Sequence, residues 1–234
     1  MITILYRDTC WQAISEYIFQ HRPSQTGVFL CRFCIQDSSG PVSNHNRIAF
    51  DFLDDERHET LEIKLVDRHN FPRDSLKDFQ RYQEVKNVYR LQNGNLTLVY
   101  NPFTEDWDAA RLIEKAEEIL SGRYVTYCAY EGNRVVGEIM LIPRLNKGRL
   151  IIDSFHVSRD YRRRGIGRAL FEAARQEALK RGAHALYASC CSSEETINFY
   201  SALGFRLSSD PIPSLAEAEP YDLQMECMII REMQ

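Results

Sequence analysis

The first hundred residues alternate between apolar and polar positions in short segments that turn-like stretches separate. Alternation with a period of two residues is typical of strands that bury one face. The strand-like segments are residues 27–35, 47–53, 60–66, 85–91 and 96–100. The last two flank Asn93-Gly94, and an Asn-Gly pair between apolar segments predicts a hairpin. We therefore expect residues 1–92 to form a largely antiparallel, β-rich domain or extension, with a short helix over residues 10–20.

Beyond residue 100 the spacing of apolar positions becomes that of amphipathic helices. Ala109, Ile113, Ala116 and Leu120 predict a helix that Thr104 caps and that ends before Gly122. The following segments read as strands 124–130, 134–142 and 149–157, helix 167–181, strand 185–190, helix 194–203, and strands 205–207 and 223–230, with a loop at 210–220. This order predicts an α/β domain over residues 93–234, with a mixed sheet covered by helices.

Composition narrows the class of protein without indicating a function. Hydrophobic residues make up 44% of the 234 residues, which excludes fibrous and wholly disordered chains. The 29 basic and 33 acidic side chains leave a net charge of -4, which argues against a nucleic-acid binder. No run of about 18 apolar residues is present, and the first twenty residues contain charges and no apolar block. We expect a cytoplasmic protein that does not bind membranes.

The seven cysteines read as reduced thiols rather than as a disulfide framework. Cys31 and Cys34 have the spacing of a metal knuckle, but no second pair accompanies them. In a strand these two side chains point to opposite faces. We therefore expect no metal site.

A basic segment between the strand at 149–157 and the next helix carries the clearest chemical signal. Five of the ten residues from 159 to 168 are arginine, and Gly165 and Gly167 lie at the expected start of the helix. A helix N-terminus presents unpaired N–H groups, and glycines let an anion approach the backbone. These features predict a phosphate or pyrophosphate site. A P-loop motif is absent, and Leu170 occupies the place of the third glycine of a dinucleotide fingerprint.

Two motifs resemble those of the GNAT superfamily of N-acetyltransferases. Arg162-Arg-Arg-Gly165-Ile-Gly167 is similar to that family's pyrophosphate motif, [Gln/Arg]-x-x-Gly-x-[Gly/Ala]. Phe199-Tyr200-Ser-Ala-Leu-Gly204-Phe205 resembles its Phe-Tyr-x-x-x-Gly-Phe helix and strand. The resemblance covers about residues 100–234, and it implies the GNAT fold. It also implies transfer of an acetyl group from acetyl-CoA to a primary amine by direct attack on the thioester.

The resemblance also implies where acetyl-CoA binds. Strands 149–157 and 185–190 would splay apart to admit it. The backbone of residues 155–157 would pair with the pantetheine arm, and the amides of residues 163–169 would hold the pyrophosphate. The expected cofactor-binding residues are Phe155, His156, Val157, Arg162, Arg163, Arg164, Gly165, Ile166, Gly167, Arg168, Ala169 and Ser193. Ser193 stands where the family often has Asn, and Ser192 with Glu195 forms an alternative capping box.

Two residues are expected to carry the chemistry. By resemblance, Tyr200 protonates the leaving thiolate, and the N–H of Val157 stabilises the oxyanion; the alternative for Tyr200 is a packed aromatic ring. Asp153 shares one strand face with Phe155 and Val157, opposite Ser154 and His156. An acid in an apolar strand is costly unless paired or functional, so Asp153 is the expected base, or else orients a loop. Glu138, on the neighbouring strand, is the second candidate.

Other functions remain open at this stage. The domain is alternatively a catalytically silent CoA-binding sensor, and the N-terminal portion is alternatively a partner-binding module. The sequence does not distinguish a small-molecule amine acceptor from a protein amine, and it leaves a homodimer open.

Overall fold

The computed structural model describes residues 48–50 and 61–229. All of them belong to the larger of two compact units, residues 32–234. The expected helix 10–20, the expected strand 27–35, and Cys31 and Cys34 lie outside the described residues. Within these residues, no helix is long and apolar enough to cross a membrane.

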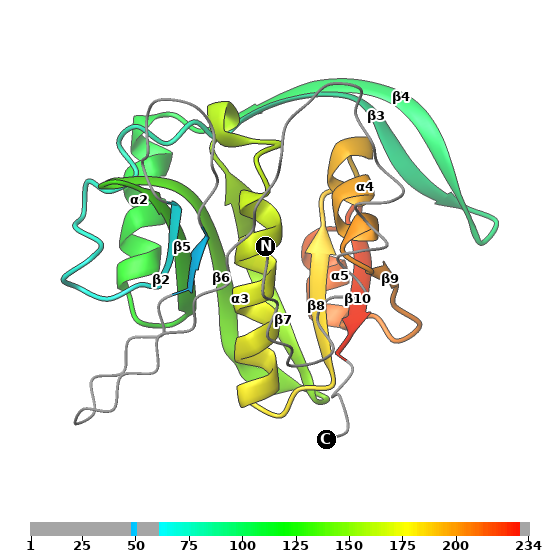
Figure 1. Cartoon of the computed structure of the whole chain (residues 1–234). Helices are drawn as coiled ribbons and strands as arrows, with labels where there is room; N and C mark the ends of the chain where they lie inside the picture. Colours follow the sequence, from blue (N-terminus) through cyan, green and yellow to red (C-terminus); the bar gives the residue numbers. More distant parts are fainter. Residues whose placement is uncertain (1–47, 51–60, 230–234) are drawn as a thin grey trace, which may run out of the picture. The chain divides into compact units, whose positions relative to one another are not determined.

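An eight-stranded mixed sheet forms the centre of the described unit (Figure 1). Its order is β1-β2-β5-β6-β7-β8-β10-β9, and β7–β8 is its one parallel pair among the described strands. The strands are β1 (Ile48–Phe50), β2 (Leu61–Leu65), β5 (Val125–Glu131), β6 (Arg134–Asn146), β7 (Arg149–Val157), β8 (Ala185–Cys190), β9 (Arg206–Leu207) and β10 (Leu223–Met228). The expected mixed α/β fold is confirmed. Strand β2, which the sequence assigned to the N-terminal portion, pairs with β5 inside this sheet.

Helices cover both faces of the sheet. They are α2 (Ala109–Leu120), α3 (Ile166–Lys180), α4 (Glu194–Ala202) and the short α5 (Pro213–Ala218). Helices α3 and α4 pack in the hydrophobic core that contains Ile139, whereas α2 packs in the core that contains Met140. Because consecutive strand residues point to opposite faces, α2 lies on the face opposite α3 and α4. Helix α5 falls within residues 210–220, so the prediction of a loop there is wrong.

Helix α2 starts later than its sequence pattern indicates. Thr104, the expected cap, lies in a strand and pairs with Glu84. Asp108 is the actual N-cap, and its side chain accepts a hydrogen bond from the Arg111 amide at 2.8 Å. The buried face is also turned from the predicted stripe: Ile113 is 50% exposed, whereas Leu112, Lys115, Ala116 and Ile119 are buried.

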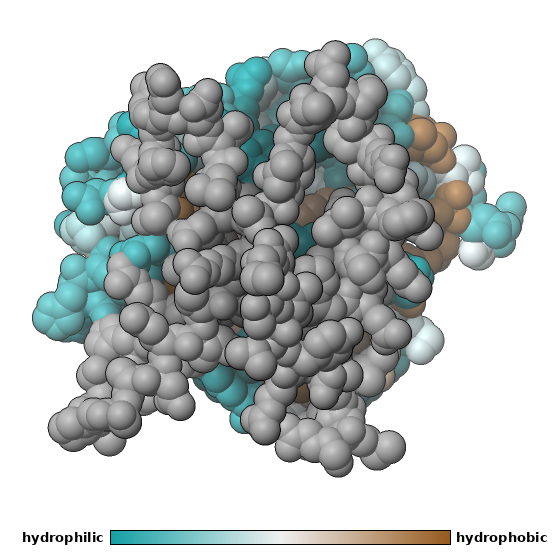
Figure 2. Space-filling view, in the orientation of Figure 1, coloured by the Kyte–Doolittle hydropathy of each residue, from teal (hydrophilic) through white to brown (hydrophobic). Residues whose placement is uncertain are grey.

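A separate two-stranded hairpin joins β3 (Tyr82–Gln92) to β4 (Asn95–Asp106). Asn93 and Gly94 both have positive φ, as the predicted hairpin turn requires. The expected domain boundary between residues 92 and 93 falls in this turn. Toward the turn end of β3 the hairpin meets the chain before α4, where the Tyr89 amide donates to the Ser192 carbonyl at 2.7 Å. The hairpin exposes four large apolar or aromatic side chains: Leu91, Leu96, Leu98 and Tyr100. Figure 2 shows brown, hydrophobic atoms at the right of this face, where the hairpin projects.

Candidate active site

Strands β7 and β8 diverge, which exposes a backbone edge in the middle of the sheet. Their parallel pairing runs from Arg149–Ala185 to Ile152–Ala188 and then stops, although β7 continues to Val157. On its other side β7 remains paired with β6 as far as Val157. The expected divergence of these two strands is therefore present, and the edge of residues 155–157 that faces β8 has no strand partner in the described sheet.

The backbone at the end of β7 is directed toward this gap. The Ser158 amide donates to the Val136 carbonyl of β6 at 2.9 Å. Because N–H groups alternate in direction along a strand, the preceding Val157 N–H is directed away from β6, toward the β8 side. The expected oxyanion donor is thus oriented into the gap.

The N-terminus of α3 lies just beyond the end of β7. Gly165 caps the helix in the left-handed conformation with φ 81°, and Arg163 also has a positive φ of 66°. Within the described residues, no hydrogen-bond acceptor is found for the backbone N–H groups of residues 163–167. Ile166 and Ala169 turn their side chains into the core. The loop therefore presents its amides, together with a helix dipole, to any anion that binds there.

The arginines of the loop have different surroundings. Arg162 Nε donates to the Val157 carbonyl at 3.0 Å and so joins the loop to the end of β7. Partial burial, reinforced by the charges of Arg81 and Arg159, lowers the pKa of Arg162. Arg164 lies 5.0 Å from the Tyr161 ring centroid and 3.8 Å from a Glu131 oxygen. Arg168 lies in the first turn of α3.

Tyr200 lies in a cluster of aromatic rings beside the gap. Its ring centroid is 6.2 Å from that of Phe155, 5.7 Å from that of Phe199 and 5.0 Å from that of Phe205. Burial is the main reason why the pKa of Tyr200 lies well above its usual value. Electrostatic repulsion of a phenolate by Cys190 and Glu138 raises this pKa further. The hydroxyl group therefore stays protonated at neutral pH.

Ser193 caps helix α4. Its hydroxyl oxygen accepts a hydrogen bond from the Thr196 amide, and Gln83 of β3 donates to the same oxygen at 3.0 Å. The N-cap is thus Ser193 and not Ser192, so the expected Ser192–Glu195 capping box is wrong. The cofactor contact expected of Ser193 stays a prediction.

Asp153 occupies a β-bulge on the face of α2. Ser154 pairs with Met140 and Ile152 pairs with Leu141, which leaves Asp153 unpaired between them. Its charge interacts with Lys115 and Glu118 of α2. The expectation that Asp153 shares a face with Phe155 and Val157 is therefore wrong, because the bulge breaks the alternation. Partial burial, aided by Glu118 and Glu138, raises the pKa of Asp153.

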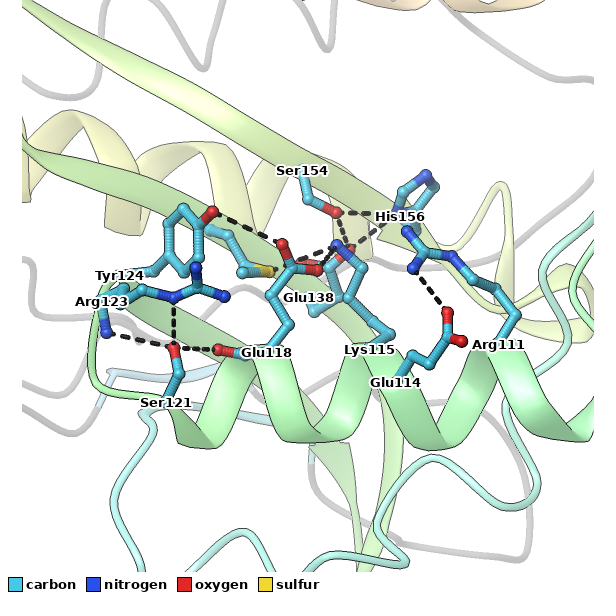
Figure 3. A network of polar contacts seen from close by, with 11 residues as sticks. Arg111, Glu114, Lys115, Glu118, Ser121, Arg123, Tyr124, Glu138, Ser154 and His156 are labelled. Carbon is cyan, nitrogen blue, oxygen red and sulfur yellow. Dashed lines mark hydrogen bonds and ion pairs between the residues drawn. The ribbon is translucent and has the colours of Figure 1, made fainter.

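Glu138 and His156 form a hydrogen-bonded pair across β6 and β7 (Figure 3). His156 Nδ1 lies 2.7 Å from Glu138 Oε1, and Ser154 Oγ donates to the same oxygen at 2.8 Å. Only the backbone of His156 was expected to function. The sequence signal for its side chain was one polar residue, Glu138 or His156, on each of two neighbouring apolar strands. Only the register of β6 against β7 shows that these two residues face each other. Within the described residues, no cluster of metal-ligating side chains is present.

Solved acetyltransferase structures share this fold. A crystal structure of nourseothricin acetyltransferase aligns over 73% of this chain and 99% of its own, with a TM-score of 0.56 and 19% identity. A putative streptothricin acetyltransferase from Bacillus anthracis, solved with acetyl coenzyme A, aligns over the same shares with a TM-score of 0.56 and 15% identity. No curated protein matches the sequence. Fold and site together define an acetyltransferase scaffold. Residues 87–205 match the model of the acetyltransferase (GNAT) family, and the chain belongs to that family.

Proposed function

We propose that the protein transfers the acetyl group of acetyl-CoA to a primary amine. The observation that carries the proposal is the divergence of β7 and β8 directly beside the glycine-containing N-terminus of α3. The gap supplies a backbone edge for an extended chain, and the helix end supplies N–H groups for an anion. A ligand that joins an extended amide-containing arm to a pyrophosphate satisfies both features at once.

The residues present fit acetyl-CoA. The amides of residues 163–167 are oriented to hold the pyrophosphate, with Arg162 and Arg164 close by. The edge of residues 155–157 pairs with the amides of the pantetheine arm, as a further strand would. The thioester then lies between the Val157 N–H and the aromatic cluster that contains Tyr200.

In this arrangement the amine nitrogen attacks the thioester carbonyl carbon directly. The Val157 N–H is positioned to donate a hydrogen bond to the oxyanion. Tyr200, which its burial keeps protonated, donates a proton to the leaving sulfur. The amine acceptor is a small molecule or a protein amine.

Two measurements on the full chain test the proposal. Saturating acetyl-CoA should raise the melting temperature by linkage, whereas S-acetyl-N-acetylcysteamine, which has the thioester but no pyrophosphate, should not. A panel of polyamines, amino sugars, lysine peptides and peptides with free N-termini should contain an amine that releases the CoA thiol. No thermal shift with acetyl-CoA would contradict the proposal. A shift without thiol release for every amine would favour a silent CoA-binding module.

A further inference from the structure

The side chain of His156 has the arrangement of a base that a carboxylate holds in place. Glu138 is 1% exposed, and its Oε1 lies 2.7 Å from His156 Nδ1 and 2.8 Å from Ser154 Oγ. Its second oxygen, Oε2, is buried and has no hydrogen-bond partner in the described part of the chain. An ionised carboxylate that accepts from both neighbours requires the proton of a neutral His156 to be on Nδ1. Nε2 then carries the free lone pair.

The surroundings of the pair favour this protonation state. Burial alone would raise the pKa of Glu138, but the hydrogen bond from His156 and the charge of Lys115 lower it below its usual value. Burial lowers the pKa of His156, and the positive charges of Arg81 and Lys115 lower it further. Glu138 raises this pKa, but the net effect is a lowered value. The result at neutral pH is a carboxylate beside a neutral imidazole.

The groups that face His156 come from several elements. Glu138 faces it from β6, Lys115 from α2 and Arg81 from β3, while the Trp107 ring packs edge-on with its centroid 4.8 Å away. Lys115 itself is buried, with Nζ 2.7 Å from Glu118 Oε2. Glu138 Oε1 lies 2.7 Å from Nδ1 and Ser154 Oγ lies 3.1 Å from it, so Glu138 makes the shorter contact and is the charged partner that orients the imidazole.

His156 lies at the gap between β7 and β8. It directly precedes Val157, the expected oxyanion donor, and its side chain lies on the α2 face, opposite Phe155 and the Tyr200 cluster. Figure 3 shows the second ring nitrogen of His156 directed away from Glu138 and Ser154. The side chain is 21% exposed.

We propose that His156 Nε2 accepts the proton of the attacking amine and that Glu138 is its positioning residue. This inference rests on the proposed acetyltransferase function and deepens it. It replaces Asp153, whose carboxylate lies on the bulge beside Lys115 and Glu118, as the base.

The step balances in atoms and electrons. The nitrogen lone pair forms the C–N bond, the carbonyl π pair moves to oxygen, and His156 Nε2 takes the proton that nitrogen loses. When the oxygen pair returns, the C–S bond breaks with its pair on sulfur, and Tyr200 protonates sulfur. The imidazolium proton then returns through solvent to the Tyr200 phenolate. The net products are the acetylated amine and CoA thiol.

His156→Gln tests the base directly, with the best amine of the panel as acceptor. We expect kcat to fall about 10²- to 10⁴-fold while the acetyl-CoA-induced thermal shift is unchanged. His184→Gln, at the far end of β8, is the matched control and should keep wild-type kcat. His156→Ala should regain activity with added 4-methylimidazole. Retention of kcat in His156→Gln, or no rescue of a folded His156→Ala, would overturn the proposal.

The pH profile separates a base from a structural residue. Because the pKa of His156 is lowered, the acid limb of kcat/KM should lie below about pH 6.5 in the wild type and vanish in His156→Gln. In Glu138→Gln the limb should move to lower pH, because the carboxylate raises the imidazole pKa. If Asp153→Asn and not His156→Gln abolished the limb, Asp153 would be the base.

Nitrogen NMR of ¹⁵N-histidine-labelled protein gives a readout that needs no amine acceptor. At pH 7.5 His156 should be neutral with its proton on Nδ1. A cationic ring, or a proton on Nε2, would overturn the inference even in a fully active protein. A wild-type protein that turns over no amine would contradict the proposed function instead, so the two failures are distinguishable.

Discussion

Gly167 on α3 and Phe199 on α4 touch so closely that no side chain fits between them. A Cβ at position 167 would lie 2.9 Å from Phe199 Cζ and 3.0 Å from Cε2. Phe199 in turn packs edge-on against Phe155 of β7, with ring centroids 5.3 Å apart. The second glycine of the pyrophosphate motif thereby sets the position of an aromatic ring at the strand gap.

Gly167→Ala should displace the Phe199 ring and, through Phe155, disturb the edge proposed to bind pantetheine. Because the clash involves the outer end of a partly exposed ring, we expect a stability loss of only about 1 kcal/mol and a weaker acetyl-CoA affinity. Urea unfolding and acetyl-CoA titration measure the two effects. Adding Phe199→Leu should restore affinity; strictly additive effects of the two changes would exclude this contact as the cause.

Tyr200→Phe should lower kcat about 10²-fold or more and leave the affinity for acetyl-CoA nearly unchanged. The change removes the proposed proton donor and keeps the ring in its aromatic cluster. Steady-state kinetics and an acetyl-CoA titration measure both quantities. Tyr221→Phe, at a tyrosine that is 72% exposed, is the matched control. An unchanged kcat in Tyr200→Phe would leave Tyr200 a packing residue.

Asp222→Asn should stabilise the protein above pH 6. Burial, followed by the charges of Glu219 and Glu105, raises the pKa of Asp222 to about 6. The folded state therefore holds a proton that the unfolded state, with a pKa near 3.9, releases, and stability falls as the pH rises from about 4 to 6. By linkage the loss is at most about 3 kcal/mol.

Urea unfolding at pH 4 and pH 7.5 checks the Asp222 prediction. The variant should lack the decrease between the two pH values. Asp210→Asn serves as the opposite control, because the hydrogen bond from Lys147 lowers the pKa of Asp210. In the wild-type protein the Asp210 carboxylate stabilises the fold at neutral pH. This contribution is lost as the pH falls through the pKa of Asp210 in the folded state. If Asp222→Asn and Asp210→Asn changed the pH dependence of stability in the same direction, the opposite pKa shifts of Asp222 and Asp210 would be contradicted.

Asp108→Ala should destabilise the protein by about 1 kcal/mol, because it removes the side-chain cap of α2. Thr104→Ala, at the position that the sequence pattern selects, should change stability by less than about 0.5 kcal/mol because the residue is an exposed strand position. Thermal unfolding of both variants compares the two caps. A larger loss in Thr104→Ala would contradict the observed start of the helix.

Apart from the short helix α5, the elements after residue 120 follow from sequence because local rules govern their positions. Gly122, Gly182 and Gly204 end helices with positive φ, and the Asn93-Gly94 turn forms where the pattern places it. The start of α2 does not follow, because β4 continues through Thr104 by pairing with β3. That pairing is a tertiary contact, and it outweighs the capping preference of a threonine.

The sequence by itself determined the strand, glycine and helix segment around Gly165, because an anion site on backbone amides needs only neighbouring residues. It also identified Asp153 as a costly acid in an apolar strand, with Glu138 on the neighbouring strand as the second candidate for the base. Only the tertiary structure decided which groups surround each carboxylate. A single bulge at Asp153 turns that carboxylate toward α2, and the register of β6 against β7 places Glu138 beside His156. Register is a property of two strands together, so neither strand's sequence contains it.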